Sequence, residues 1–279
     1  MHEPEEPEPT IVAKRPSDDL LFQASEMDRA LIDLLARLES STRWPAFNAV
    51  RHLNRAWRIR NDDPEMAAFR SITAVEEAAT SIFLALKRHR YQGADKLKPR
   101  DHVQKNAVLF FFDAMTRVLA TIQTPPPIQL KLDKSVDPPN LVIQIQLPHP
   151  TRGIAWATPR PPLHFTARHS VDGGQTYRVE DFAAGLAEVA TQANATTISD
   201  HLRKRANERN RLLYASTRGY PTFSGDIEKV LRRHQRDVFT LIRLYLLIDP
   251  YPTIQSFVQQ ALLGFLKMLD LFAGDIEFA

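Results

Sequence analysis

The sequence predicts a mainly α-helical protein in which an antiparallel helical bundle carries a small antiparallel β insertion, an α+β arrangement overall. Two observations predict this class. Apolar residues recur at helical spacing through the first part of the chain and again after about residue 180. Between Pro125 and Pro162, prolines are dense and short segments alternate apolar with polar residues, which disfavours helices and is typical of strands.

Four helices are expected before the insertion. Residues 1–16 alternate Pro with Glu and hold few apolar side chains, so a disordered acidic tail should precede the first helix. The expected helices span 17–39, 44–60, 64–89 and 102–122. The first, third and fourth have candidate N-caps, whose side-chain oxygens can accept from free amides of a first turn: Ser17, Asp62 or Asp63, and Asp101.

The insertion is expected to cover residues 125–179. The expected strands are 128–132, 141–147, 153–157, 164–170 and 176–179. Asp172-Gly173-Gly174 suits the turn of a hairpin between the last two strands. Helical periodicity returns at Phe182 and continues through Leu213, either unbroken or with a break near Asn194–Ser199. Two further helices are expected at 224–247, capped by Ser224, and at 253–271.

The composition excludes several kinds of site. The chain has no cysteine, which removes disulfides, iron–sulfur clusters, thiolate zinc sites and cysteine nucleophiles. No histidine pair at helical spacing has a carboxylate nearby and no glycine-rich phosphate loop is present, so no metal or cofactor is expected. No apolar run is long enough for a membrane helix, and the acidic start is unlike a secretion signal. We therefore expect cytoplasmic residence without membrane contact.

The positive charge is concentrated in one part of the chain. The formal net charge is only +3, but residues 201–236 hold a large excess of Lys and Arg over Asp and Glu. Such a block can attract phosphate backbones. A basic stretch is a solvated helix face about as often as it is a binding surface for nucleic acid, and both interpretations stay open.

Two pairs of ionisable residues stand out in the first half of the chain. Glu76 and Glu77 lie in an apolar helix, where neighbours differ by about 100°, so at least one carboxylate is close to the core and needs a partner. His102 and Lys105 share a face at the start of a buried helix. An acid–base site is one interpretation. The other interpretation is that one of the glutamates forms a structural salt bridge and that His102 is a surface residue. The sequence does not show whether Glu77 and His102 are in contact.

The stretch Arg209-Asn210-Arg211-Leu212-Leu213-Tyr214 is the third candidate. Asn210 and Tyr214 are four residues apart and should share a helix face, while the two leucines should fix the helix to the core. Arg209 can hold a phosphate with two hydrogen bonds, and an amide and a phenol can orient ribose or phosphate oxygens. This pattern is compatible with RNA binding or RNA cleavage.

These motifs together resemble the HEPN superfamily. Arg-Asn-Arg-Leu at 209–212 is similar to HEPN toxins of the HepT kind. Glu76-Glu77, then His102-x-x-Lys105, then an Arg-rich segment ending in Leu213-Tyr214 resemble abortive-infection proteins of the AbiV family. The resemblance implies a HEPN-like bundle formed by 17–124 and 180–279.

The resemblance also implies a function. It implies metal-independent RNA cleavage through the ribose 2′-OH, a homodimer with paired motifs in one cleft, and a role in antiviral defence or a toxin–antitoxin system, with an antitoxin or defence protein as partner. By the resemblance, the residues at the reaction are Arg209, Asn210, Tyr214, His102 and Glu77. The RNA-binding residues would be Lys105, Arg205, Arg211 and Arg218.

The sequence departs from the HEPN motif at one position, where Tyr214 replaces the expected histidine. A tyrosine has a pKa near 10 and is a poor base at neutral pH. Three hypotheses follow: a HEPN-like endoribonuclease in which His102 or His201 substitutes, a catalytically inactive HEPN-like module that binds RNA or a protein, and a helical scaffold whose β insertion docks a partner.

Overall fold

The structure is a computed structural model. It describes residues 20–120, 127–149, 151, 153–165, 168–171, 176–179, 207, 209–214 and 219–274, with only the backbone for 114–120, for 168–171, for 176–179 and for 271–274. The expected tail at 1–16, the Asp172–Gly174 turn and the helical stretch from Phe182 to 206 lie outside these residues. The described part is mainly helical with a small antiparallel sheet, which confirms the α+β class.

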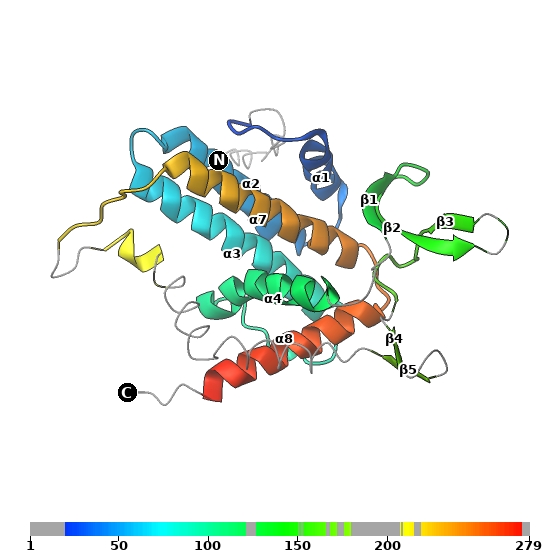
Figure 1. The fold of residues 1–279 in the computed structure, drawn as a ribbon. Helices are drawn as coiled ribbons and strands as arrows, with labels where there is room; N and C mark the ends of the chain where they lie inside the picture. The colour runs from blue at the N-terminus through cyan, green and yellow to red at the C-terminus, as the bar shows by residue number, and fades with distance from the viewer. Residues whose placement is uncertain are drawn as a thin grey trace, which may run out of the picture.

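Three long helices form the centre of the molecule. α2 (Arg43–Ile59), α3 (Pro64–Arg88) and α7 (Ile227–Ile248) lie side by side (Figure 1). Their facing apolar side chains form one buried core that includes Leu53, Phe83 and Phe239. Burial of such side chains supplies the main driving force for folding.

Local capping explains where two of these helices begin. Asp63 accepts a hydrogen bond from the amide of Met66 at 2.9 Å and Pro64 is the first residue of α3, as expected. The prediction that Ser224 caps α7 is wrong. Asp226 caps the helix instead by accepting from the Lys229 amide at 3.0 Å.

The first helix begins later than the sequence predicts. α1 spans Glu26–Arg37, and its cap is Ser25 rather than Ser17, which lies outside the described residues. Ser25 Oγ accepts from the Asp28 amide at 3.1 Å, and the Asp28 carboxylate accepts from the Ser25 amide at 3.2 Å. This reciprocal capping box fixes the boundary, and the preceding residues 20–25 are not helical.

Two further helices complete the described bundle. α4 (His102–Ala120) packs against α3, and α8 (Ser256–Gly274) packs against α4. Asp101 caps α4 as predicted, because its Oδ1 accepts from the amides of Val103 and Gln104. None of the described helices is both long enough and apolar enough to span a bilayer.

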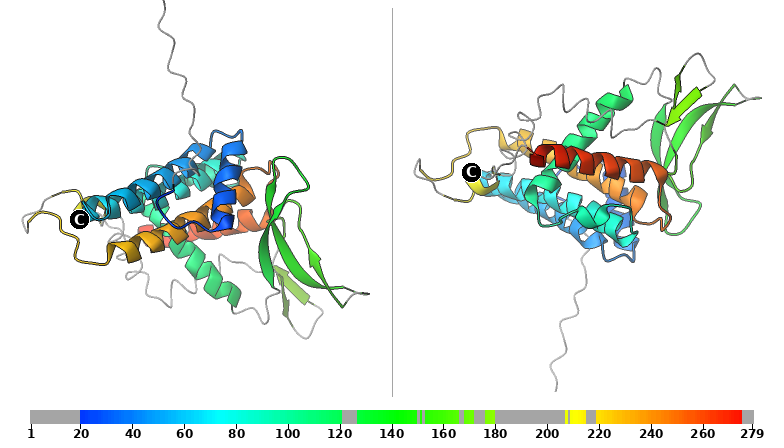
Figure 2. Two further views of the ribbon diagram at one scale, coloured as in Figure 1. Left: turned by 90° about the horizontal axis from the view of Figure 1, so that it is seen from above. Right: turned by 90° about the horizontal axis from the view of Figure 1, so that it is seen from below.

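The predicted β insertion is present as two sheets. β1 (Ile128–Asp133), β2 (Asn140–His149) and β3 (Gly153–Ala157) form an antiparallel sheet in the order β1-β2-β3, and β4 (Arg168–Val171) pairs with β5 (Thr176–Val179). The three-stranded sheet lies at one end of the helices (Figures 1 and 2).

Apolar and polar contacts attach the insertion to the helices. Leu141 of β2 is fully buried in the common core, and its carbonyl accepts from the Tyr251 hydroxyl at 3.2 Å. The strand expected at 164–170 begins only at Arg168. The Phe165 ring before it stacks on Phe257 of α8, with ring centroids 4.9 Å apart.

The basic segment is less helical than expected. Residues 209–211 are helical, but Leu212 and Leu213 lie in a turn in which the amides of Leu213 and Tyr214 both donate to the Asn210 carbonyl at 3.1 Å. The prediction of a helix that continues through Leu213 is therefore wrong at its end. The two leucines are half-buried.

Candidate functional site

The candidate site forms where α4 begins beside the middle of α3. Glu76 projects from α3, and its side chain is only 2% exposed. Its Oε2 lies 2.8 Å from Nδ1 of His102, the first residue of α4. Because Asp101 caps α4 immediately before this residue, the helix start holds the imidazole at a fixed position beside the carboxylate.

Two neighbours on α4 complete the surroundings of Glu76. Lys105 Nζ lies 3.6 Å from Glu76 Oε2, and the lysine side chain is 7% exposed. Asn106 Nδ2 donates to the His102 carbonyl at 2.8 Å and to Glu76 Oε1 at 3.4 Å. A buried carboxylate requires such partners, since an unpaired buried charge is very costly.

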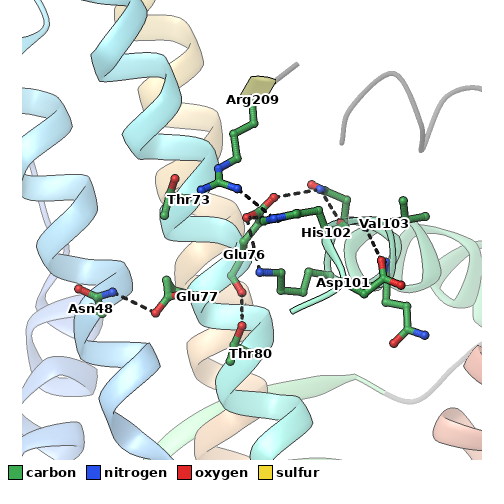
Figure 3. Close-up of polar contacts among 12 residues, drawn as sticks. Asn48, Thr73, Glu76, Glu77, Thr80, Asp101, His102, Val103 and Arg209 are labelled. Carbon is green, nitrogen blue, oxygen red and sulfur yellow. Dashed lines mark hydrogen bonds and ion pairs between the residues drawn. The ribbon is translucent and has the colours of Figure 1, made fainter. Parts of the chain in front are cut away.

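Arg209 reaches this pair from a distant part of the sequence. Its Nη1 lies 3.0 Å from Nε2 of His102, and its guanidinium stacks on the Phe69 ring at 4.9 Å from the ring centroid. Figure 3 shows Glu76, His102 and Arg209 pointing toward one another from three segments. We call these three residues the candidate site.

The hydrogen bonds assign the tautomer of His102. Ionised Glu76 can only accept, so His102 Nδ1 carries the hydrogen. Arg209 can only donate, so His102 Nε2 carries the lone pair. The histidine is therefore neutral, with its basic nitrogen directed toward the arginine. A neutral imidazole oriented by a carboxylate is a suitable general base.

The structure places Glu76, not Glu77, beside His102. Glu77 lies on the α2 side of α3, where its Oε2 accepts from Asn48 Nδ2 at 3.0 Å (Figure 3). The contact between His102 and a glutamate of α3 therefore exists, but with Glu76 rather than Glu77. Adjacent helical residues differ by about 100°, and α4 covers the face that carries Glu76.

The remaining predicted residues are not all at this site. Lys105, predicted to bind RNA, is buried because it balances Glu76. Asn210 and Arg211 are exposed, and Tyr214 is 67% exposed. Arg205, Arg218 and His201 lie outside the described residues. No group of three metal-ligating side chains occurs among the residues that the structure describes.

A cluster of positive charge adjoins the candidate site and was not predicted. His52 of α2 is half-buried, and its buried Nδ1 has no hydrogen-bond partner in the part of the chain that the structure describes. Burial is the main cause that lowers its pKa to about 4. Nearby guanidinium charges lower this pKa further, and they belong, in order of decreasing effect, to Arg70, Arg55, Arg51 and Arg209.

This lowered pKa predicts a pH-dependent stability. The pKa of His52 is about 4 in the fold against an ordinary 6.5, so the unfolded chain binds the proton more readily. The contribution of His52 is fully present above pH 6.5 and is lost as the pH falls toward 4. Since the side chain is partly solvated, we expect a loss of about 1–2 kcal/mol in the free energy of unfolding.

Urea denaturation of the wild type and of His52→Gln at pH 7 and pH 4.5 measures this contribution. Carboxylates titrate in both proteins, so the difference between the two pH dependences isolates the histidine. The variant should lose less stability on acidification, and equal losses would contradict the assignment.

Some of the missed residues had a readable signal in the sequence. Asn106 lies four residues after His102 and therefore shares its helix face. Arg51, Arg55 and Arg58 recur at helical spacing in the same way. The contact of Phe69 with Arg209 joins distant segments, and no spacing indicates it.

Comparison with protein-family models, with curated proteins and with solved structures finds no match to this chain. Function is therefore inferred from the residues that the fold brings together.

Proposed function

We propose that this protein is a HEPN-like, metal-independent endoribonuclease whose reacting groups are His102 and Arg209, with Glu76 as the residue that positions His102. The observation that carries the proposal is the 3.0 Å contact between a basic imidazole nitrogen and an arginine. In RNA, the 2′-OH and the phosphate that it attacks are neighbours on one ribose, so two groups this close can contact both.

The proposed reaction is an internal transesterification. His102 Nε2 accepts the proton of the 2′-OH, and the 2′-oxygen forms a bond to the adjacent phosphorus. The bond from phosphorus to the 5′-oxygen breaks, that oxygen takes a proton from solvent, and His102 afterwards releases its proton to solvent. The products are a 2′,3′-cyclic phosphate and a free 5′-OH, with no change of oxidation state and no other reactant.

Arg209 and Glu76 support this step electrostatically. The guanidinium can donate two parallel hydrogen bonds to phosphate oxygens, on which negative charge increases in the transition state. Arg209 is held by Phe69 on one side, and its buried Nε has no partner among the described residues. Glu76 stabilises the imidazolium that forms when His102 takes the proton.

This assignment supplies the histidine that the HEPN motif lacks in this sequence. Tyr214 replaces it in the chain, whereas His102 lies beside Arg209 in space. The HEPN-like bundle, a homodimer, and a role in antiviral defence or a toxin–antitoxin system with a protein partner belong to the same proposal. They rest on the motif resemblance alone.

The second candidate function is RNA binding without cleavage. One observation favours it: Arg209 donates to His102 Nε2, so the lone pair that would take the proton is occupied in this conformation. Cleavage requires the phosphate to draw the guanidinium away from the histidine. A module that only binds RNA requires no such movement.

Substitution of Arg209 tests the proposal. Purified wild type should cleave single-stranded RNA in EDTA, and Arg209→Ala should reduce the rate by about 10²–10³, the loss typical of one transition-state donor. Arg29→Ala removes one exposed charge from α1 and serves as the matched control. Salt-sensitive RNA binding without cleavage by the wild type selects the second candidate function, and an undiminished rate in Arg209→Ala removes Arg209 from the site.

A further inference from the structure

Three arginines of α2 form a continuous basic stripe. Arg51, Arg55 and Arg58 are exposed and are spaced by four and three residues, so they lie on one helix face. They extend over about 10 Å of the helix axis. Desolvation is the largest cause that lowers the pKa of the Arg55 guanidinium, and the charges of Arg51, of Arg70 on α3 and of Arg58 lower it further, which places Arg70 beside the stripe.

The charges of this cluster are not balanced within the described protein. Elsewhere in the described protein, other arginines form ion pairs, such as Arg60 with Glu228 and Arg243 with Asp28. None of the four clustered arginines has an ion pair with a described carboxylate. Like charges held this close repel one another, so an anionic ligand should stabilise the cluster.

The stripe adjoins the candidate site through α3. Arg70 and Glu77 are seven residues apart and share the α3 face that meets α2. Phe69 and Glu76 share the neighbouring face, which holds Arg209 and His102. Figure 3 shows both faces, with Asn48 on one side and Arg209 on the other.

An aromatic side chain continues the stripe beyond the arginines. Trp44 lies seven residues before Arg51 and so shares the same face of α2, and it is 54% exposed. The guanidinium of Arg43 lies over its ring at 4.7 Å. Exposed aromatic rings beside a basic groove are typical of single-strand binding, because an unpaired base presents a face for stacking.

We propose that single-stranded RNA binds along the α2–α3 hairpin, with its phosphates on Arg51, Arg55, Arg58 and Arg70 and one base on Trp44. This surface, which we call the arginine track, leads the strand to the candidate site. The inference rests on the proposed function for the identity of the ligand. It adds a binding surface that is separate from the groups that react.

Binding of an RNA that cannot react tests the track separately from cleavage. The probe is a short fluorescent 2′-O-methyl RNA, which lacks the attacking hydroxyl, and anisotropy is measured over a range of salt concentrations. Each phosphate contact contributes about 0.7 to the slope of log K against log salt for single strands. Arg51→Gln with Arg55→Gln should lower that slope by about 1.4.

Two further variants separate the track from general charge and from folding. Arg29→Gln with Lys267→Gln removes the same charge from exposed positions on α1 and α8 and should leave the slope unchanged. Trp44→Leu should weaken binding about tenfold, and Trp44→Phe should restore most of it. The melting temperature of the Arg51 and Arg55 variant should not fall, because its substitutions relieve repulsion.

The outcomes distinguish the two proposals. A slope that falls equally in the control overturns the track, and so does an unchanged slope in the Arg51 and Arg55 variant. Duplex RNA or anionic lipid vesicles that bind through the same arginines more tightly than the single strand also overturn it. If the track binds the probe while unmodified RNA stays intact, the proposed cleavage fails and the track stands.

Discussion

Replacing His102 by alanine should reduce RNA cleavage in EDTA by about 10²–10⁴, the contribution typical of a general base. His102 Nε2 is the basic nitrogen beside Arg209, and its Nδ1 is held by Glu76. The side chain is 41% exposed, but it donates to the buried Glu76 carboxylate, so its loss should cost about 1–3 kcal/mol of stability. Cleavage rates and thermal unfolding of the same preparation check both expectations.

His102→Gln is the matched control for this prediction. Its amide can still donate to Glu76 but cannot take a proton at neutral pH. Cleavage should therefore stay low while binding of 2′-O-methyl RNA stays near that of the wild type. A glutamine variant that cleaves at the wild-type rate would show that the histidine only supports the structure.

Replacing Glu76 by alanine should have the largest effect on folding, with a loss of about 3–5 kcal/mol in the free energy of unfolding. The carboxylate is buried, and its removal leaves the buried Lys105 ammonium without its ion-pair partner, while Asn106 loses only its longer contact at 3.4 Å. Cleavage should fall as well, because His102 loses the group that fixes its tautomer. Chemical denaturation measures the first effect.

A second substitution separates charge from packing. In Glu76→Ala with Lys105→Met, neither buried charge remains, so much of the lost stability should return while cleavage stays low. Glu77→Ala is the matched single variant on the same turn. It breaks only a half-buried bond to Asn48 and should cost less. A double variant no more stable than Glu76→Ala would contradict the buried pair.

The sequence predicted the helices best where a cap and a periodic pattern agree. Asp63 with Pro64 and Asp101 before His102 mark the starts of α3 and α4 correctly. Ser17 and Ser224 were equally plausible caps by residue type, but neither starts a described helix. The capping box formed by Ser25 and Asp28 determines where α1 begins. In the sequence, Asp28 is only one acidic residue among several, so this box could not be singled out.

The choice between Glu76 and Glu77 could not be made from the sequence. Both lie on an apolar helix, and the choice depends on which face α4 covers. Glu76 is twelve residues before the end of α3, or about 18 Å. The connector between α3 and α4 must run back beside α3 over about 18 Å for His102 to reach Glu76. Its path includes Gly93 at a φ of 85° and the short 3-10 helix η1 (Ala94–Lys96), which periodicity does not predict.

The position of Lys105 shows the same limit. The His102-x-x-Lys105 spacing correctly predicts that the two side chains share a face of α4. Whether that face meets solvent or α3 is a tertiary property. It meets α3, so the lysine serves the buried carboxylate rather than an external phosphate.

The most direct test of the central claim is the chemistry of the RNA ends. Unmodified single-stranded RNA is incubated in EDTA with the wild type and with His102→Ala, and the products are analysed by mass spectrometry. The wild type should yield 2′,3′-cyclic phosphate and 5′-OH ends at a rate that collapses in the variant. Intact RNA with the wild type, or the same ends at the same rate with His102→Ala, would contradict the claim that Glu76, His102 and Arg209 form an RNA-cleaving site.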